Sequence, residues 1–238
     1  MHPLVWLKSC GLLIVLISLC APKLVFADVI AIIGTGQVAK ALGPEFAQLG
    51  HVIVYGSREP MRDDVIALVA RTKNKASATT PPESVLAADI VVLAVPGEAV
   101  ETVIKSLGDL SGKIIIDPTN VLHKGRDGLF ELGVETSNAE MIQGWAPDAF
   151  VVKAFSTLNW RTMVDPDSSG GPVSILLVGN NVEAKAVVAA LAEGMGLEPI
   201  DLGPIRYAHY IEGMLVMWAN RYLGGQQFEY HLRKTIAR

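Results

Sequence analysis

An apolar run that feeds directly into a glycine turn constrains this chain more than any other stretch. Residues 29–33 (VIAII) show no polar alternation and are β-branched apart from one alanine, which is typical of a parallel strand covered on both faces. Residues 34–39 (GTGQVA) then follow the pattern G-x-G-x-x-G/A, whose glycines make the bend and let the backbone approach a pyrophosphate. A helix that begins there directs its unpaired N–H groups at the phosphates. We therefore predict a dinucleotide-binding turn, with cofactor contacts from Gly34, Thr35, Gly36, Gln37 and Val38.

The residues that follow the second strand predict which dinucleotide binds. An NAD site needs an acidic residue about 20 positions beyond the glycines, to accept a hydrogen bond from the ribose 2′-OH. This chain has Gly56 at that place, followed by Ser57 and Arg58, and a permanently charged guanidinium can bind a phosphate through two hydrogen bonds. We therefore expect NADP rather than NAD, with Ser57, Arg58 and Arg62 as cofactor-binding residues. The alternative is that Ser57 and Arg58 form an ordinary solvated turn and that Glu59 is the displaced acid.

Strand and helix patterns alternate along the rest of the chain with short connections, as right-handed βαβ units require. Helices are expected at residues 63–70, 81–88, 97–107, 136–145, 182–195 and 205–223. Strands are expected at residues 51–55, 76–80, 89–96, 113–117, 150–157, 173–179 and 197–201. This order predicts an α/β fold: a Rossmann-type, doubly wound, mainly parallel sheet with a small C-terminal extension. The NADP-binding domain with its extension would span residues 28–223, and residues 224–238 would form a loosely ordered tail.

Ligands of such sheets lie beyond the carboxyl ends of the strands. Ala94, Val95 and Pro96 end one expected strand, and Asn120 follows the next one along the chain. Backbone groups of Ala94 and Val95 would flank the nicotinamide ribose, and Asn120 would hydrogen-bond the substrate or the carboxamide. For Pro96 the alternative is plain turn chemistry, and for Asn120 and Asp117 it is a helix cap or turn.

Four short segments together resemble a known family. Residues 34–36 (GTG), 55–58 (YGSR), 94–97 (AVPG) and 151–155 (VVKAF) are similar to the NADP-dependent reductases of the deazaflavin coenzyme F420. They are equally similar to the related NADPH-binding domain of STEAP-type metalloreductases. The resemblance covers about residues 28–223 and implies NADP as cofactor, with a deazaflavin or flavin as second substrate. It also implies that the backbone at Ala154 meets the nicotinamide amide.

Hydride transfer between stacked rings needs an oriented, dry crevice but no side-chain acid or base. No nucleophile–base pair, metal-ligand cluster or pair of carboxylates stands out at the expected strand ends. We therefore expect an NADP(H)-dependent oxidoreductase with a deazaflavin or flavin-like acceptor, no metal and no particular catalytic side chain. One alternative is a flavin-mediated ferric or cupric reductase of the metalloreductase type. The other is a non-catalytic NADP(H)-binding module that senses the cofactor or docks a partner.

Residues 1–27 have the pattern of a signal peptide. Lys8 precedes an apolar core at residues 11–20, and small residues before Asp28 suggest a cleavage site. Both cysteines, Cys10 and Cys20, lie in this leader. Cleavage predicts an exported protein, although NADP is a cytosolic cofactor. An uncleaved anchor that holds the domain inside the cell is therefore the alternative.

The expected partners are a small-molecule electron acceptor and a second copy of the chain. A net charge of −4 without a basic stripe argues against nucleic acid. The apolar stripe of the last helix is wider than a small domain needs and predicts a homodimer. Its members are Tyr207, Ile211, Met214, Leu215, Trp218 and Tyr222.

Two further expectations concern polar residues outside the fingerprint. Residues 121–133 are rich in glycine and charge and predict a mobile surface loop over the strand ends, with His123 as its histidine. His209 and Glu212 are three residues apart on the last helix and are expected to form a surface pair rather than a metal site.

Overall fold

A computed structural model describes residues 28–221, 226 and 228–235 of the 238-residue chain. The expected leader at residues 1–27 and Tyr222 of the predicted stripe lie outside the described residues. Within the described part, no helix is long and apolar enough to cross a membrane.

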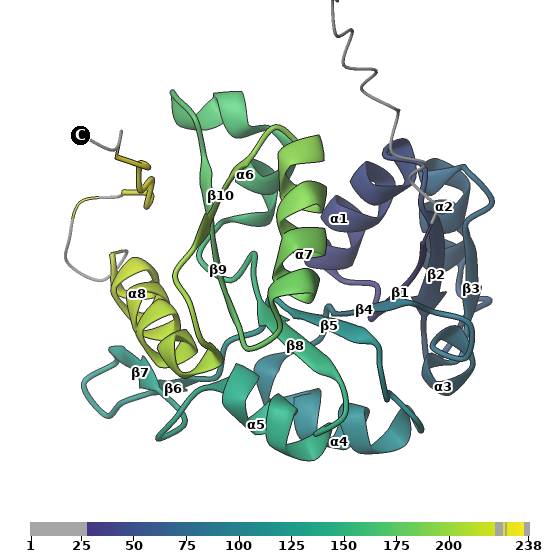
Figure 1. The fold of residues 1–238 in the computed structure, drawn as a ribbon, viewed down its shortest axis with the longest axis horizontal. Coiled ribbons are helices and arrows are strands. Elements are labelled where there is room, and N and C mark those ends of the chain that lie inside the picture. The colour runs from purple at the N-terminus through teal and green to yellow at the C-terminus, as the bar shows by residue number, and fades with distance from the viewer. Residues whose placement is uncertain (1–27, 222–225, 227, 236–238) are drawn as a thin grey trace, which may run out of the picture.

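Eight strands form one sheet, in the order β10-β9-β8-β5-β4-β1-β2-β3 (Figure 1). All neighbours in this sheet pair in parallel except β8 and β9, which are antiparallel. The strands are β1 Val29–Ile33, β2 Val52–Gly56, β3 Ser77–Thr79, β4 Ile90–Leu93, β5 Ile114–Asp117, β8 Phe150–Lys153, β9 Ser174–Gly179 and β10 Glu198–Asp201. The prediction of a Rossmann-type, doubly wound, mainly parallel sheet is confirmed.

Helices cover both faces of the sheet, because its inner strands are apolar on both sides. Alternate side chains of β1 enter different cores: Ile30 and Ile32 pack into one, and Ala31 and Ile33 into the other. The first core is covered by α1 Gln37–Gln48, α2 Asp63–Thr72, α6 Trp160–Val164 and α7 Val182–Gly194. The second is covered by α3 Pro81–Ser84, α4 Val100–Ser106, α5 Asn138–Trp145 and α8 Ala208–Asn220 (Figure 1). Three 3-10 helices complete the fold: η1 Gly97–Ala99, η2 Pro166–Ser169 and η3 Ile205–Tyr207.

Residues 121–133, expected as a surface loop, instead contain a β-hairpin. Strands β6 Leu122–Lys124 and β7 Phe130–Leu132 pair antiparallel. The side chain of Asn220 on α8 accepts a hydrogen bond from Phe130 N at 2.7 Å and donates one to Phe130 O at 2.8 Å. The Asn220 amide therefore pairs with the backbone at the edge of the hairpin, as the backbone of a further strand would. The two residues are 90 positions apart in the sequence.

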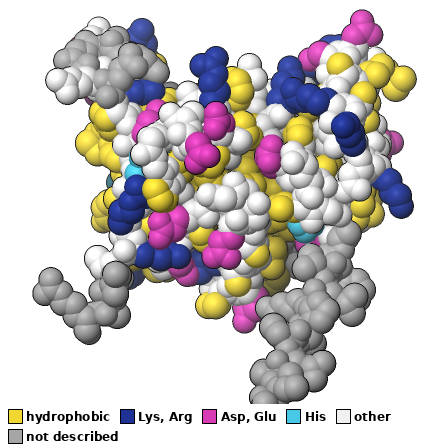
Figure 2. All heavy atoms as spheres, turned by 90° about the horizontal axis from the view of Figure 1, so that it is seen from above, with side chains coloured by type: hydrophobic (Ala, Val, Ile, Leu, Met, Phe, Trp, Pro, Cys, Tyr) yellow, Lys and Arg dark blue, Asp and Glu magenta, His cyan; other side chains and the backbone are white. Residues whose placement is uncertain are grey.

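The described residues of the tail contact the body of the domain. Leu232 N donates to the Ser174 hydroxyl at 2.9 Å, and the Trp218 indole N–H donates to Glu229 at 3.1 Å. On the face of the molecule seen in Figure 2, acidic and basic side chains are interspersed.

Candidate cofactor site

The glycine turn joins the ends of three neighbouring strands. Gly34 N donates to Gly56 O, and Ala94 N donates to Ile33 O, both at 2.9 Å. Gly34 has φ +105°, and a Cβ at this position would lie 2.3 Å from Ala94 O. Only glycine allows β1 to turn this close to the end of β4.

The N-terminus of α1 is open to a ligand. Gly36 is its N-cap and provides no side-chain cap, so the N–H groups of the first turn have no side-chain acceptor there. An added Cβ on Gly36 would meet no atom within 4 Å. The helix has twelve residues, no side-chain cap and free space beside its N-cap glycine. These features suit the binding of a pyrophosphate. Gln37 and Val38, the next predicted contacts, are the first two residues of this helix.

The residues expected at the 2′-phosphate lie just beyond β2 and differ in how strongly they are held. Ser57 is buried, and its hydroxyl accepts a hydrogen bond from Glu59 N at 3.2 Å. Arg62 donates to Asp64 at 2.5 Å and to the Thr35 hydroxyl at 3.3 Å, which ties it to the glycine turn. Its hydrogen bond and charge lower the pKa of Asp64.

Arg58 is exposed and makes no hydrogen bond or ion pair with any described residue. Its guanidinium therefore has no internal anion to displace. Arg62, in contrast, would have to share its charge between Asp64 and a ligand.

The residues expected at the nicotinamide end follow β4, β5 and β8, which are adjacent in the sheet. Ala94 and Val95 are half-buried and Pro96 is exposed. A Cβ on Gly97 would lie 2.2 Å from Asn120 O, so the start of η1 packs directly on the loop after β5. Ala154 is fully buried, and its N–H donates to Asp117 O at 3.2 Å.

Asn120 caps no described helix, so the cap alternative is wrong for this residue. Its amide N–H donates to Ser156 O at 3.1 Å and thereby joins the loops after β5 and β8. Asp117, in contrast, has the predicted turn role, because its carboxylate accepts from Thr119 N at 2.8 Å. Helix α5 is instead capped by Ser137, which accepts from Glu140 N at 3.1 Å.

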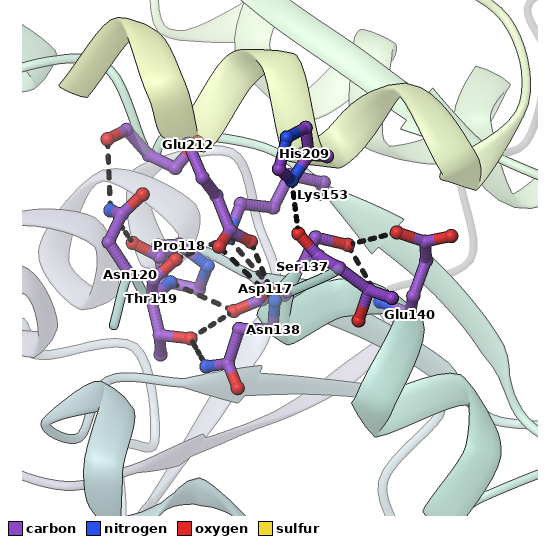
Figure 3. A network of polar contacts seen from close by, with 12 residues as sticks. Asp117, Pro118, Thr119, Asn120, Ser137, Asn138, Glu140, Lys153, His209 and Glu212 are labelled. Atoms are coloured by element: carbon purple, nitrogen blue, oxygen red, sulfur yellow. Dashed lines mark hydrogen bonds and ion pairs between the residues drawn. The ribbon is translucent and has the colours of Figure 1, made fainter. Parts of the chain in front are cut away.

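Three charged side chains that sequence reasoning did not bring together are buried beneath these strand ends (Figure 3). Lys153 at the end of β8 lies 3.0 Å from Asp117 of β5 and 2.8 Å from Glu212 of α8. All three side chains are fully buried. Glu212 also accepts from Asn138 N at 2.9 Å, and Lys153 donates to Thr119 O. We refer to Asp117, Lys153 and Glu212 as the buried triad.

The buried triad has one cation for two carboxylates, and the pKa directions follow from this imbalance. Burial alone would lower the pKa of Lys153, but the charges of Asp117 and Glu212 outweigh it and raise that pKa. Burial raises the pKa of Glu212, and the nearby Lys153 offsets this only in part because the like charge of Asp117 raises the same pKa further.

The triad corrects one expectation. Glu212 does not form a surface pair with His209: it is fully buried, whereas the His209 ring donates to Thr136 O at 2.5 Å. Asp117 at the end of β5 and Glu212 on α8 are brought together only through Lys153, an arrangement that joins a strand end to a helix and that the sequence did not indicate. A lysine inside the apolar run VVKAF was the available signal, since a buried ammonium requires a partner. Among the described residues, no three His, Cys, Asp or Glu side chains gather as metal ligands.

Comparisons with known proteins agree with the Rossmann-type fold and with an NADP-dependent family. The family described as "NADP oxidoreductase coenzyme F420-dependent" matches residues 29–121. A crystal structure of a putative F420-dependent NADP reductase from Arthrobacter sp. FB24 is 31% identical. It has a TM-score of 0.78 and covers 87% of this chain and 100% of its own.

Two curated relatives are similar over most of this chain. The F420-dependent NADP reductase of Methanothermobacter thermautotrophicus is 25% identical over 210 residues, covering 83% of this chain and 90% of that protein. The metalloreductase STEAP3 of Rattus norvegicus is 30% identical over 189 residues, which are 79% of this chain. Those residues are only 36% of STEAP3, so the chain spans about a third of the metalloreductase's length.

Proposed function

The chain belongs to the coenzyme F420-dependent NADP oxidoreductase family, related to the STEAP metalloreductases, and we propose that it transfers a hydride between NADPH and a flat deazaflavin or flavin-like acceptor. Its class is that of NADP-dependent oxidoreductases with a Rossmann-type fold. The acceptor and the residues that bind each substrate are the subject of the proposal.

The observation that carries the proposal is the line of five strand ends along one edge of the sheet. In the order β2, β1, β4, β5, β8 they present the Ser57–Arg58 turn, the glycine turn, residues 94–96, Asn120 and Ala154. Four spacings of about 4.8 Å separate the first strand from the last, so the line is about 19 Å long. An extended dinucleotide fits along it, with its 2′-phosphate at Arg58 and its nicotinamide near Asn120.

The chain's own residues bind and orient in this scheme. The glycine turn would hold the pyrophosphate, Ser57 and Arg58 the 2′-phosphate, and Ala94 and Val95 the nicotinamide ribose. The cofactor, when bound, supplies the hydride, and its transfer to a stacked ring requires orientation rather than a side-chain acid. The fully buried triad cannot touch a substrate, so we assign it a positioning role beneath the crevice.

Anaerobic stopped-flow absorbance at the nicotinamide band tests the proposal with the full chain. NADPH is mixed in turn with oxidised coenzyme F420, with FMN or FAD, and with a ferric chelate, with and without flavin. We expect rapid NADPH oxidation by a deazaflavin or flavin alone. Ferric reduction that requires no flavin would contradict the proposal, as would tight NADPH binding without oxidation by any acceptor, which is the behaviour of a sensor or docking module.

We also propose that the chain forms a homodimer through α8 and that residues 1–27 act as a cleaved signal peptide. Tyr210 and Met217 on α8 lie outside the predicted stripe and are 68% and 57% exposed, which supports an apolar contact there, whereas Ile211 of the stripe is buried in the second core. N-terminal sequencing of the protein from its host tests the second proposal: Asp28 as first residue is expected, and a retained Met1 in the membrane fraction contradicts it.

A further inference from the structure

Arg62, one of the arginines expected at the 2′-phosphate, is engaged by two other residues of the chain. Its Nε donates to Asp64 Oδ1 at 2.5 Å, and its Nη2 donates to Asp64 Oδ2 at 3.2 Å. The same Nη2 donates to the Thr35 hydroxyl at 3.3 Å. These hydrogen bonds join the first turn of α2, which contains Asp64, to the glycine turn.

The three hydrogen bonds occupy both edges through which this guanidinium can bind an anion with two N–H groups. One edge consists of Nε and Nη2, and the other of Nη1 and Nη2. Asp64 uses the first edge, and Thr35 takes the remaining hydrogen of Nη2. A phosphate can therefore form two hydrogen bonds with Arg62 only if it displaces one of these partners.

Asp64 is the partner that a phosphate displaces, because both groups are anions. A phosphate bound to Arg62 would lie close to the Asp64 carboxylate and repel it, whereas the neutral Thr35 hydroxyl can donate to a phosphate oxygen. The side chains of Arg62 and Asp64 are each about half exposed, so the pair can separate without disturbing a core.

Lys40 on α1 provides a second partner for the displaced carboxylate. Its Nζ lies 4.0 Å from Asp64 Oδ2, and its side chain is about one-third exposed. Asp64 can therefore remain beside Lys40 after Arg62 has turned to a phosphate. This exchange keeps every charge paired, so the cost of releasing Arg62 is moderate.

We propose that Asp64 is an internal anion that competes with the 2′-phosphate of NADPH for Arg62 and so determines how strongly the site prefers NADPH to NADH. This inference rests on the proposed binding of NADPH. Without cofactor, Arg62 bonds Asp64. With NADPH bound, Arg62 bonds the 2′-phosphate and Lys40 holds the Asp64 carboxylate. NADH carries no such phosphate, so its binding leaves the Arg62–Asp64 pair intact.

Asp64→Asn in the full chain tests the competition by equilibrium binding, because it removes the charge and keeps the size of the side chain. The ligands are NADPH, NADH and the fragments 2′,5′-ADP and 5′-AMP, which differ from each other only in the 2′-phosphate. Asp63→Asn is the matched control. Asp63 is exposed in the same helical turn and makes no hydrogen bond or ion pair with any described residue.

We expect Asp64→Asn to tighten the binding of NADPH and 2′,5′-ADP about two- to fivefold, the effect of losing one exposed ion pair. The affinities for NADH and 5′-AMP should not change, and the gain should shrink in high salt. Unchanged or weaker NADPH binding overturns the proposal, since weaker binding would mean that Asp64 orients Arg62 for the phosphate. An equal gain in Asp63→Asn also overturns it.

The same substitution in an Arg62→Ala background separates competition from direct repulsion. Without Arg62 there is nothing to compete for, so the gain from Asp64→Asn should disappear. A gain that persists overturns the proposal, because the carboxylate would then act on the phosphate directly. None of these readouts needs turnover. A wild type that binds NADPH and NADH equally would count against the NADP site itself, whereas an unchanged Asp64→Asn beside a wild type that prefers NADPH counts against this inference alone.

Discussion

The two ends of the candidate cofactor site are built on different principles. The phosphate end consists of a glycine turn, an uncapped helix and an arginine without a described partner, all within residues 34–62. The nicotinamide end stands on the buried triad, whose members come from positions 117, 153 and 212. The first end is local backbone that offers its polar groups to a ligand, whereas the triad beneath the second end is long-range side-chain pairing that offers none. Substitutions of ligand-facing groups at the first end should therefore change affinity, and substitutions in the buried triad should change stability.

The largest effect is expected for Lys153→Met. It removes the cation between two buried carboxyl groups and should destabilise the fold by about 3–5 kcal/mol. Denaturant unfolding measures this against Lys105→Met, because Lys105 pairs at 2.6 Å with Glu101 on the surface of α4, and both side chains are more than half exposed. Such an exposed pair should contribute at most about 1 kcal/mol. Equal losses for the two variants would mean that burial of the triad has no energetic consequence.

Alanine substitutions at the two glycines of the turn should separate an effect on the stability of the fold from an effect on NADPH affinity. Gly34→Ala introduces a Cβ 2.3 Å from Ala94 O at φ +105° and should cost about 1–3 kcal/mol of stability. Gly36→Ala meets free space, so the fold should be unaffected while NADPH binding falls about tenfold or more, because the methyl group fills the phosphate position. Thermal unfolding and an NADPH titration measure both quantities. Unchanged affinity in folded Gly36→Ala would place the cofactor elsewhere.

Glu212→Gln should have an effect that depends on pH. The raised pKa of Glu212 means that the folded state holds a proton that the unfolded chain releases above about pH 4.3. The wild type therefore loses stability as pH rises from that value through the raised pKa, by about 1.4 kcal/mol for each pH unit that separates the two pKa values. The variant lacks this titration, so its deficit relative to the wild type should shrink as pH rises above about 4.3. A deficit that grows with pH would mean that Lys153 lowers the pKa of Glu212 instead.

Met217→Glu should change assembly with little effect on the fold. A charge at this exposed position of α8 should separate the proposed homodimer, because an unpaired charge buried in an apolar contact is costly. The stability of each subunit should change by no more than about 0.5 kcal/mol. Light scattering measures the oligomeric state, with Leu86→Glu as the control, since Leu86 follows α3 and is 78% exposed. A monomeric wild type, or a dimeric Met217→Glu, contradicts the proposal.

The contrast between the two ends also explains which parts of the fold and of the site could be predicted from the sequence. The sheet, the glycine turn and most of the alternating helices depend on local patterns, so their places were predictable within a few residues. The five-residue helix α6 is too short for such a pattern and was missed. The pairing of Lys153 with Glu212 joins positions 59 residues apart and leaves no periodic trace. The hairpin at residues 122–132 was missed because its edge is completed by Asn220, far along the chain.

The central claim is that Arg58 makes the phosphate end an NADP site, and one comparison tests it directly. The affinities of NADPH and NADH are measured for the wild type, Arg58→Ala and Arg62→Ala. We expect Arg58→Ala to weaken NADPH by about 1.5–3 kcal/mol and to leave NADH unchanged. Arg62→Ala should lose less, since Asp64 already engages its guanidinium at 2.5 Å. A wild type that binds both dinucleotides equally, or an equal loss of NADPH and NADH in Arg58→Ala, would contradict the account.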